Sequence, residues 1–194
     1  MSKHAELIFI RGLPGSGKSY LTMALQAALD KDRLVVLDPD AVDRLSQAYQ
    51  AHVDALTAEG VETALHLYRY LRAQAYQGIE AGKIIIWNQP FTNLEIFHKM
   101  IGRLRDHARE HEVELSILIV EVEADPTVAR GRVAARKRSG GHGPSETTFE
   151  RFVNDYQSFA DEGYKAVTVS GADDVDKSVR TVLAALGPDV ANPK

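Results

Sequence analysis

Five short apolar runs rich in β-branched residues recur along the chain, and longer stretches with helical periodicity separate them. The runs lie at residues 7–10, 34–37, 84–87, 115–122 and 166–169. Each run is almost continuously apolar, which is typical of parallel strands that helices cover on both faces. The alternation therefore predicts βαβ units around a mostly parallel sheet, which makes this an α/β chain.

Helical periodicity predicts helices at residues 18–29, 41–51, 58–81, 94–110, 126–138, 146–162 and 174–186. Asn93, Asp125 and Ser145 directly precede three of these stretches, and such residues cap helix N-termini. The length of 194 residues suits one domain, and no internal repeat is visible. We therefore expect a single domain over residues 1–194.

Composition excludes several classes of protein. The chain has no cysteine, which rules out disulfides, thiolate catalysis and cysteine-ligated zinc. Its formal net charge of −4 gives no general attraction to nucleic acids or to anionic membranes. No stretch approaches the roughly 18 apolar residues of a membrane span, and the first residues form no apolar secretion segment. These features predict a cytoplasmic protein with neither nucleic-acid nor membrane partners.

A glycine-rich segment between the first apolar run and the first helical stretch matches the pattern G-x-x-x-x-G-K-[ST]. Glycines there let consecutive backbone N–H groups surround a phosphate, and the helix N-terminus adds positive potential. Lys18 is predicted to reach the β- and γ-phosphates, and the Ser19 hydroxyl to hold Mg²⁺. The predicted nucleotide contacts are Gly12, Pro14, Gly15, Ser16, Gly17, Lys18 and Ser19. The segment thus predicts binding of a nucleoside triphosphate.

Two carboxylates, Asp38 and Asp40, follow the second apolar run. Ligands of open α/β sheets bind outside the carboxyl ends of the strands, so both acids are expected beside the phosphate-binding loop. We expect Asp38 to lie near Mg²⁺ and Asp40 to meet the hydroxyl of an acceptor, because phosphoryl transfer needs an oriented nucleophile. The alternative for Asp40 is a helix N-cap before residue 41.

Five cations and no acid lie within residues 130–138. On a helix, Arg132 and Arg136 share one face, whereas Arg130 and Arg138 turn away from it. We therefore expect Arg132 and Arg136 to act on the transferred phosphoryl group as catalytic cations. The alternative is a solvated charged face, which would account for at least part of the cluster.

A second glycine-rich segment, at residues 139–144, follows this basic cluster directly. A flexible loop beside basic helix ends is typical of a lid over a phosphate site, so we predict a lid over about residues 130–147. The alternative is an ordinary turn between two helices. His142 lies in this loop and is either a turn residue or a contact to phosphate or substrate.

The loop GLPGSGKS, the acid pair in DPD and the segment RVAARKRSGGHGPSETTFERF together resemble the small P-loop kinases of the zeta-toxin and polynucleotide-kinase group. The resemblance implies a three-layer P-loop NTPase fold, with a five-stranded parallel sheet in the order 2-3-1-4-5 and a helical lid. It also implies ATP as the phosphoryl donor, Mg²⁺ as the metal and Asp40 as the acid that orients the acceptor hydroxyl. Adenine is then expected near residues 170–172, with Ser170 as a nucleotide contact.

The chain departs from this group in two places. Its third apolar run is followed by Asn88 and contains no carboxylate where many P-loop ATPases hold Mg²⁺, which disfavours a motor or a GTPase-like switch. Arg44 follows Asp40 at the fourth position, whereas polynucleotide kinases commonly place an arginine at the third. This second departure disfavours a polynucleotide acceptor.

The resulting prediction is an ATP-dependent kinase that phosphorylates a hydroxyl of a small polar acceptor, such as a nucleotide sugar, a nucleoside or a sugar. One alternative is an ATP-binding regulatory or ATPase module without transfer, and another is a polynucleotide 5′-hydroxyl kinase. A toxin role would also require an antitoxin-like protein partner, for which the sequence displays no feature.

Other polar and aromatic residues are assigned to packing or to the surface. Tyr68 lies in the long helical stretch beside leucines, and only Arg69 and Arg72 accompany it, which is too little for a single-strand nucleic-acid groove. His107 and His111 have the spacing of two metal ligands on a helix, but no glutamate of the zincin pattern lies between them, so an ordinary surface helix is predicted.

Overall fold

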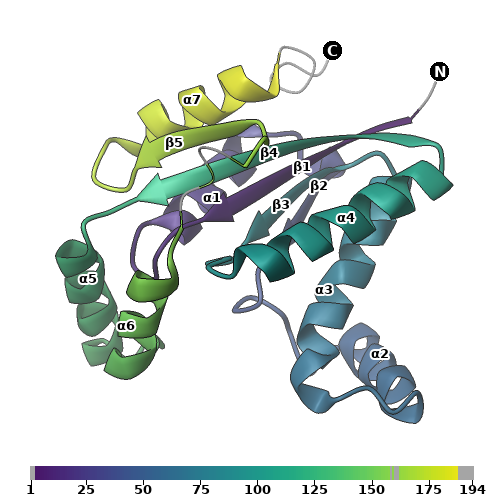
Figure 1. Cartoon of the computed structure of the whole chain (residues 1–194), viewed down its shortest axis with the longest axis horizontal. Helices are drawn as coiled ribbons and strands as arrows, with labels where there is room; N and C mark the ends of the chain where they lie inside the picture. The colour runs from purple at the N-terminus through teal and green to yellow at the C-terminus, as the bar shows by residue number, and fades with distance from the viewer. Residues whose placement is uncertain (1–2, 158, 160–161, 188–194) are drawn as a thin grey trace.

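The five predicted runs form one parallel sheet in the computed structural model, which describes residues 3–157, 159 and 162–187. The strands are β1 (Lys3–Arg11), β2 (Leu34–Leu37), β3 (Ile84–Asn88), β4 (Val113–Glu123) and β5 (Ala166–Ser170). Their order is β2-β3-β1-β4-β5 and each neighbouring pair is parallel, which confirms the predicted topology. The central strand β1 therefore delivers the phosphate-binding loop to the middle of the sheet edge (Figure 1).

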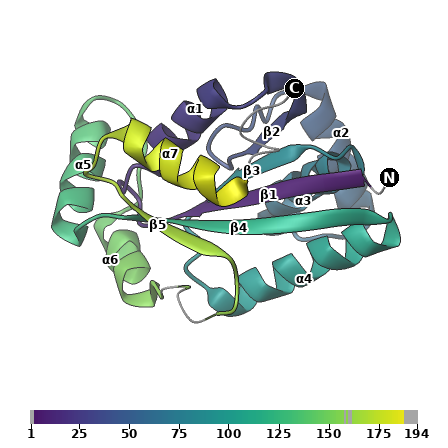
Figure 2. The same cartoon turned by 90° about the horizontal axis from the view of Figure 1, so that it is seen from above.

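Helices cover both faces of the sheet. They are α1 (Lys18–Ala28), α2 (Gln47–Ala58), α3 (Thr63–Glu80), α4 (Leu94–Glu110), α5 (Pro126–Arg138), α6 (Glu146–Asp155) and α7 (Val175–Leu186), with a short 3₁₀ helix η1 (Lys31–Arg33) before β2. Figures 1 and 2 show α1 and α7 on one face and α3 and α4 on the other. The α5–α6 pair stands beyond the end of β4, and α2 packs beside α3 away from the sheet. None of the described helices is long and apolar enough to cross a membrane.

The apolar core has two main parts, one on each face of the sheet. Leu7 and Phe9 of β1 enter the core under α3 and α4, whereas Ile8 and Ile10 enter the core under α1 and α7. All four side chains are fully buried, which explains why the run is continuously apolar in the sequence. Burial on both faces leaves only the strand ends and the loops that follow them free for ligands.

The helices after β2 differ from the prediction. Residues 41–46 are not helical, and α2 begins at Gln47, where the Ser46 hydroxyl accepts a hydrogen bond from the N–H of Tyr49. The predicted helix over 58–81 is interrupted, because Gly60 lies between α2 and α3 with a φ of 74°. The helix predicted over residues 146–162 is also shorter than expected and ends at Asp155. Because residues 41–46 are not helical, the connection after β2 is free to border a site at the ends of the strands.

A buried ion pair lies at the carboxyl end of the central strand. Arg11, the last residue of β1, is fully buried, and its Nη1 donates to Glu121 Oε1 of β4 at 2.5 Å. The same guanidinium donates to the carbonyl oxygens of Phe91, at 3.2 Å, and Gln157, at 2.6 Å. Its carbon lies 4.3 Å from the ring centroid of Phe159. Arg11 thus joins the start of the phosphate-binding loop to the β3–α4 loop and to the segment after α6.

We expect Glu121→Gln to lower the free energy of unfolding by about 3–5 kcal/mol, because it leaves the buried Arg11 guanidinium without its counter-charge. In a protein of this size, that loss lowers the unfolding temperature by about 6–20 °C. The matched control is Glu150→Gln, which removes the carboxylate that pairs with Arg130 at the surface, where a loss of at most about 1 kcal/mol is expected. Equal unfolding temperatures for the two variants in thermal denaturation would contradict this interpretation.

Candidate nucleotide and phosphoryl-transfer site

The phosphate-binding loop links the end of β1 at Arg11 to the start of α1 at Lys18. Gly12, Gly15 and Gly17 all have positive φ angles, and Gly17 is the residue before the first turn of α1. A Cβ on Gly15 would come within 2.3 Å of the carbonyl oxygen of Ala129 in α5. Only glycine therefore combines this backbone conformation with such close contact between the loop and α5.

Lys18 has an almost fully buried side chain and is 9% exposed. Its Nζ donates to the carbonyl oxygen of Leu13 within the loop at 2.9 Å. Burial lowers the pKa of Lys18 from 10.5 to about 8; Asp38 and Asp40 partly oppose this shift, and Arg136 adds to it. No carboxylate among the described residues bonds directly to this buried ammonium, which is therefore suited to receive the charge of a phosphate.

Ser19, Asp38 and Asn88 meet where the ends of β2 and β3 lie beside the loop. The amide nitrogen Nδ2 of Asn88 donates to Asp38 Oδ2 at 2.7 Å and to Ser19 Oγ at 3.3 Å. Asn88 is 5% exposed, and its Oδ1 is a buried atom with no hydrogen-bond partner among the described residues. Asn88 thus connects the two predicted metal ligands from the position where the sequence has no acid. In the sequence, the only indication of this role is that Asn88 directly follows the third apolar run.

Asp38 and Asp40 both line the cavity beside the loop. Asp38 Oδ1 accepts a hydrogen bond from the backbone N–H of Asp40 at 2.9 Å, and the Asp38 carbonyl accepts one from Ala41 at 3.0 Å. This turn replaces the helix that the sequence predicted at residue 41, so Asp40 is not a helix N-cap. The Asp40 side chain is exposed toward the cavity and available to a ligand.

The arginines of α5 divide as their helical spacing predicts. Arg132 and Arg136 line the cavity, whereas Arg130 forms ion pairs with Glu146 and Glu150 of α6. Nη1 of Arg132 donates to the carbonyl oxygen of Gly171 at 3.0 Å. Arg132 therefore connects α5 to the loop after β5, and Arg136 is the cation of α5 whose charge acts on Lys18.

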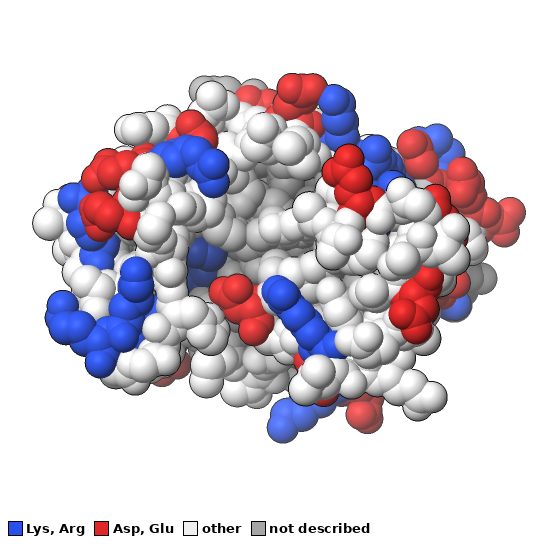
Figure 3. Space-filling model, turned by 90° about the horizontal axis from the view of Figure 1, so that it is seen from below, with Lys and Arg blue, Asp and Glu red and all other residues white. Residues whose placement is uncertain are grey.

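A cavity of about 1080 Å³ collects most of these groups. It extends from the phosphate-binding loop, past the two aspartates and the end of β3, to α3 and α4, with residues of α5 and of the loop after it on the opposite side. Figure 3 shows this face of the molecule hollowed at its centre, between the side that carries α5 and α6 and the side that carries α2 and α3. Its lining includes Pro14, Gly15, Gly17, Lys18, Ser19, Asp38, Asp40, Arg132, Arg136 and His142. The predicted residues from four separate parts of the sequence thus share one cavity.

A family model described as AAA domain matches residues 7–159, which include the phosphate-binding loop, both aspartates and the predicted lid. The chain belongs to the AAA domain family. A search of curated protein sequences gives no significant match.

Solved structures of kinases share the fold of this AAA domain. A sugar kinase from Janibacter sp. HTCC2649 has a TM-score of 0.59 at 16% identity, with 94% of each chain covered. A gluconokinase from Sinorhizobium meliloti 1021 has a TM-score of 0.56 at 16% identity, over 96% of this chain and 93% of the other. A fungal RNA kinase has a TM-score of 0.59 at 11% identity, over 96% of this chain and 86% of the other. The AAA domain therefore has the fold of the small P-loop kinases.

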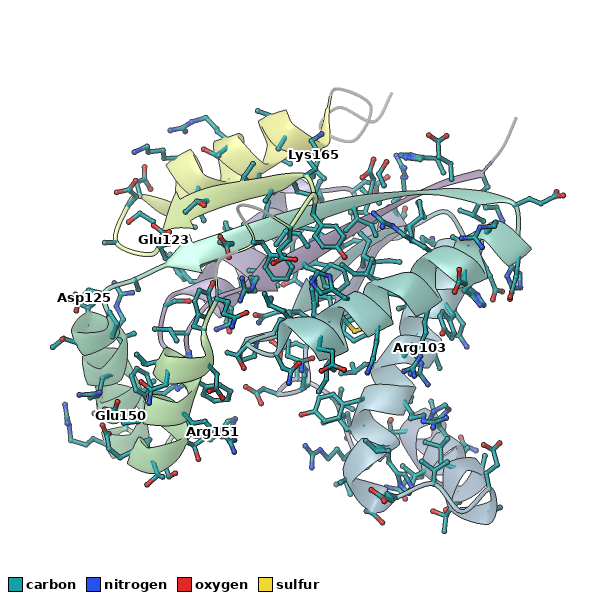
Figure 4. The ribbon with its side chains drawn as sticks, in the orientation of Figure 1. Arg103, Glu123, Asp125, Glu150, Arg151 and Lys165 are labelled. Carbon is teal, nitrogen blue, oxygen red and sulfur yellow. The ribbon has the colours of Figure 1, made fainter. Side chains whose placement is uncertain are left out.

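A second cavity, of about 560 Å³, adjoins the first in this AAA domain, and Arg132 lines both. It lies between the β4–α5 connection and the loop after β5, and its lining includes Ser170. Glu123 and Asp125, labelled in Figure 4, lie at its margin at the end of β4 and the start of α5. Ser170 Oγ accepts a hydrogen bond from the N–H of Ala172 at 3.1 Å, so Ser170 lies in the second cavity and outside the lining of the first.

Two predicted nucleotide contacts of the AAA domain lie beneath the first cavity. Gly12 packs against β4, where a Cβ would come within 2.5 Å of the Val122 carbonyl oxygen. Ser16 is fully buried, and its Oγ has no hydrogen-bond partner among the described residues. An orphaned hydroxyl and a buried ammonium in one loop fit a bound phosphate chain, and the oxygen ligands Ser19 and Asp38 fit Mg²⁺.

The backbone of Gly171 touches the phosphate-binding loop. A Cβ at this residue would come within 1.8 Å of the Ser16 carbonyl oxygen, although the sequence assigned no structural role to Gly171. We expect Gly171→Ala to displace the loop, to lower the unfolding temperature by about 6–12 °C and to weaken binding of an ATP analogue at least about tenfold. Gly102→Ala is the control, because nothing lies within 4 Å of that added Cβ in α4, and it should slightly stabilise the protein. Equal analogue affinities of the two variants in calorimetry would contradict the proposed contact.

Tyr68 and His107, which were predicted to serve packing or the surface, lie in two different environments. Tyr68 is 48% exposed and lines the first cavity, together with Arg69 and Arg72. His107 lies outside that lining, donates or accepts a hydrogen bond with Glu80 at 2.9 Å and stacks on Tyr76. The histidine contact joins α3 to α4, whereas the face of α3 with Tyr68 belongs to the candidate site.

Proposed function

We propose that this AAA domain is an ATP- and Mg²⁺-dependent kinase that transfers the γ-phosphoryl group of ATP to a hydroxyl of a small polar acceptor. The single observation that supports this best is the shared cavity, which has Lys18 and Ser19 at one side, Asp40 at another and Arg136 on the lid. Donor-binding and acceptor-orienting groups in one enclosed space are what phosphoryl transfer requires.

In the proposed reaction, Lys18 and the loop amides hold the donor phosphates, and Ser19 and Asp38 hold Mg²⁺, which neutralises phosphate charge when it is bound. Asn88 donates a hydrogen bond to each of these two side chains and so helps to position them. The acceptor oxygen bonds to the γ-phosphorus while the bond to the β–γ bridging oxygen breaks and ADP leaves. Asp40 orients the acceptor hydroxyl and takes its proton.

The lid arginines would compensate the charge of the moving phosphoryl group. Arg136 acts electrostatically on Lys18, so its charge also reaches the space in which the γ-phosphate would lie. Arg132 lines both cavities, and we propose that it separates the phosphates from an adenine held beside Ser170. Arg44 is absent from the lining of both cavities, which gives a polynucleotide acceptor no support from this residue.

The test is incubation with γ-labelled ATP, Mg²⁺ and a panel of sugars, nucleosides, nucleotides and a 5′-hydroxyl oligonucleotide. We expect label in at least one small acceptor, and none after chelation of Mg²⁺. ATP binding without label in any acceptor would favour the regulatory alternative. Label in the oligonucleotide alone would favour the polynucleotide kinase.

A further inference from the structure

Three arginine side chains line the first cavity from the helices that face the lid. Arg69 and Arg72 come from α3, and Arg103 comes from α4. Figure 4 shows Arg103 on the side of α4 that turns toward α3. Because Arg69 and Arg72 lie three residues apart on a helix, they share the face that borders the cavity. The three guanidinium groups therefore gather at the end of the cavity formed by α3 and α4.

None of these three arginines forms an ion pair or a hydrogen bond with another residue in the described part of the chain. Other arginines on α4 do have partners, since Arg109 pairs with Asp106 at 3.1 Å and Arg105 lies 5.5 Å from the Tyr164 ring centroid. Among the arginines of α3 and α4, the ones without such a partner in the described part of the chain are thus the ones that line the cavity.

The charges of the three arginines act on one another. Burial lowers the pKa of Arg72, and the positive charges of Arg103 and Arg69 lower it further, whereas Tyr76 opposes the shift. Like charges held together without a counter-ion destabilise this part of the protein, and a bound anion would remove that cost. An arginine cluster of this kind is suited to phosphate, because guanidinium groups donate two parallel hydrogen bonds to its oxygens.

We infer that the acceptor already carries a phosphate or diphosphate group, and that Arg69, Arg72 and Arg103 bind this group while the acceptor hydroxyl meets Asp40. Identifying the bound molecule as the acceptor rests on the proposed kinase function, whereas the anion site itself does not. A dianion or a diphosphate matches three cations better than a single carboxylate does. The inference excludes neutral sugars and nucleosides as the preferred acceptors.

The remaining lining at this end indicates where the rest of such an acceptor lies. Leu65, Tyr68 and Ile96 are large apolar side chains that are 43%, 48% and 65% exposed, respectively, and all three line the cavity. Exposed apolar side chains inside a cavity favour a ligand with an apolar or planar part. The acceptor is therefore a phosphorylated small molecule whose ring or chain contacts this surface.

The anion site is tested by calorimetry with inorganic pyrophosphate on protein saturated with Mg²⁺ and a non-hydrolysable ATP analogue, so that the phosphate-binding loop is already filled. The variants are Arg69→Gln/Arg72→Gln and, as a control with the same charge change, Arg105→Gln/Arg109→Gln. We expect the first variant to weaken pyrophosphate binding at least tenfold with unchanged analogue affinity, and the control to bind like the unmodified protein. Malonate, a dicarboxylate, should bind at least tenfold more weakly than pyrophosphate.

The outcomes separate the two proposals. If the analogue binds and pyrophosphate affinity is the same in all three proteins, or if malonate binds as well as pyrophosphate, the phosphate site is overturned while the kinase proposal stands. If the unmodified protein does not bind the analogue, the kinase proposal fails, and a tenfold loss of pyrophosphate binding in the first variant still supports the anion site.

A kinetic readout tests the same site during transfer. With matched pairs of acceptors that differ only in one phosphate, we expect label in the phosphorylated member at least tenfold faster than in the neutral member. Arg103→Gln should raise KM for that acceptor at least tenfold and change kcat much less, because the guanidinium binds a group remote from the reacting oxygen. Equal rates within each pair would overturn the inference.

Discussion

Lys18→Met is expected to lower phosphoryl transfer at least about 10³-fold and, at the same time, to stabilise the nucleotide-free protein. Transfer falls because the buried ammonium of the phosphate-binding loop is predicted to bind the donor phosphates. Stability rises because burial lowers the pKa of Lys18 from 10.5 to about 8, which corresponds to a cost of up to about 3 kcal/mol for the charged form. Without that cost, the unfolding temperature should increase by several degrees.

The cost of burying the charged Lys18 should make the stability of the protein depend on pH. Below about pH 8, Lys18 is protonated in both the folded and the unfolded chain, so the full cost is present. Between about pH 8 and 10.5, Lys18 binds more protons in the unfolded chain than in the folded chain. The free energy of unfolding of the unmodified protein therefore rises with pH in this range. Thermal denaturation of Lys18→Met should lack this rise, whereas Lys99→Met, a surface control on α4, should retain it.

Nucleotide affinity should fall as the pH rises, whereas the stability of the nucleotide-free protein rises. Phosphate favours the charged ammonium, so above about pH 8 a proton must be taken up before the nucleotide binds, and the dissociation constant should rise by up to about tenfold per pH unit. Calorimetry between pH 7 and 9.5 measures this rise. An analogue affinity that stays constant over the range, or a Lys18→Met variant as active as the unmodified protein, would contradict the assigned role.

Asp40→Asn is expected to lower the rate of transfer about 10²- to 10⁴-fold without changing the affinity for the ATP analogue. Asparagine keeps the size of the side chain but accepts no proton and orients the acceptor hydroxyl less well. Asp40 is exposed toward the cavity and bonds to no other side chain in the described part of the chain, so the fold should be unaffected.

Asp43→Asn is the matched control for this experiment. Asp43 lies on the same connection after β2, accepts a hydrogen bond from the N–H of Leu45 at 2.9 Å and does not line the cavity. Its replacement should leave the rate of transfer unchanged. If Asp40→Asn kept the full rate with every acceptor that takes label, Asp40 would have to be removed from the reaction.

The sequence alone was sufficient for the sheet and for the position of the glycine-rich loop between β1 and α1. Continuous apolar runs and a glycine-rich loop before Lys18 depend on local chemistry, since strands buried on both faces and a loop around phosphate each require particular residues in a row. The spacing of Arg132 and Arg136 likewise follows from helical geometry alone, and the structure places both at the cavity as expected. Local patterns failed after β2, where a turn between Asp38 and Ala41 stands at the start of the helix predicted over residues 41–51 and α2 begins only at Gln47.

Tertiary structure decided everything that depends on residues far apart in the chain. Asn88 meets Ser19 and Asp38 only because β3 lies between β2 and β1, and Gly171 meets Ser16 only because β5 ends beside the loop. In the same way, Arg103 joins Arg69 and Arg72 through the packing of α4 beside α3. A periodic pattern records the face that a residue occupies on its own element, whereas the neighbour across a cavity is determined by how the elements pack.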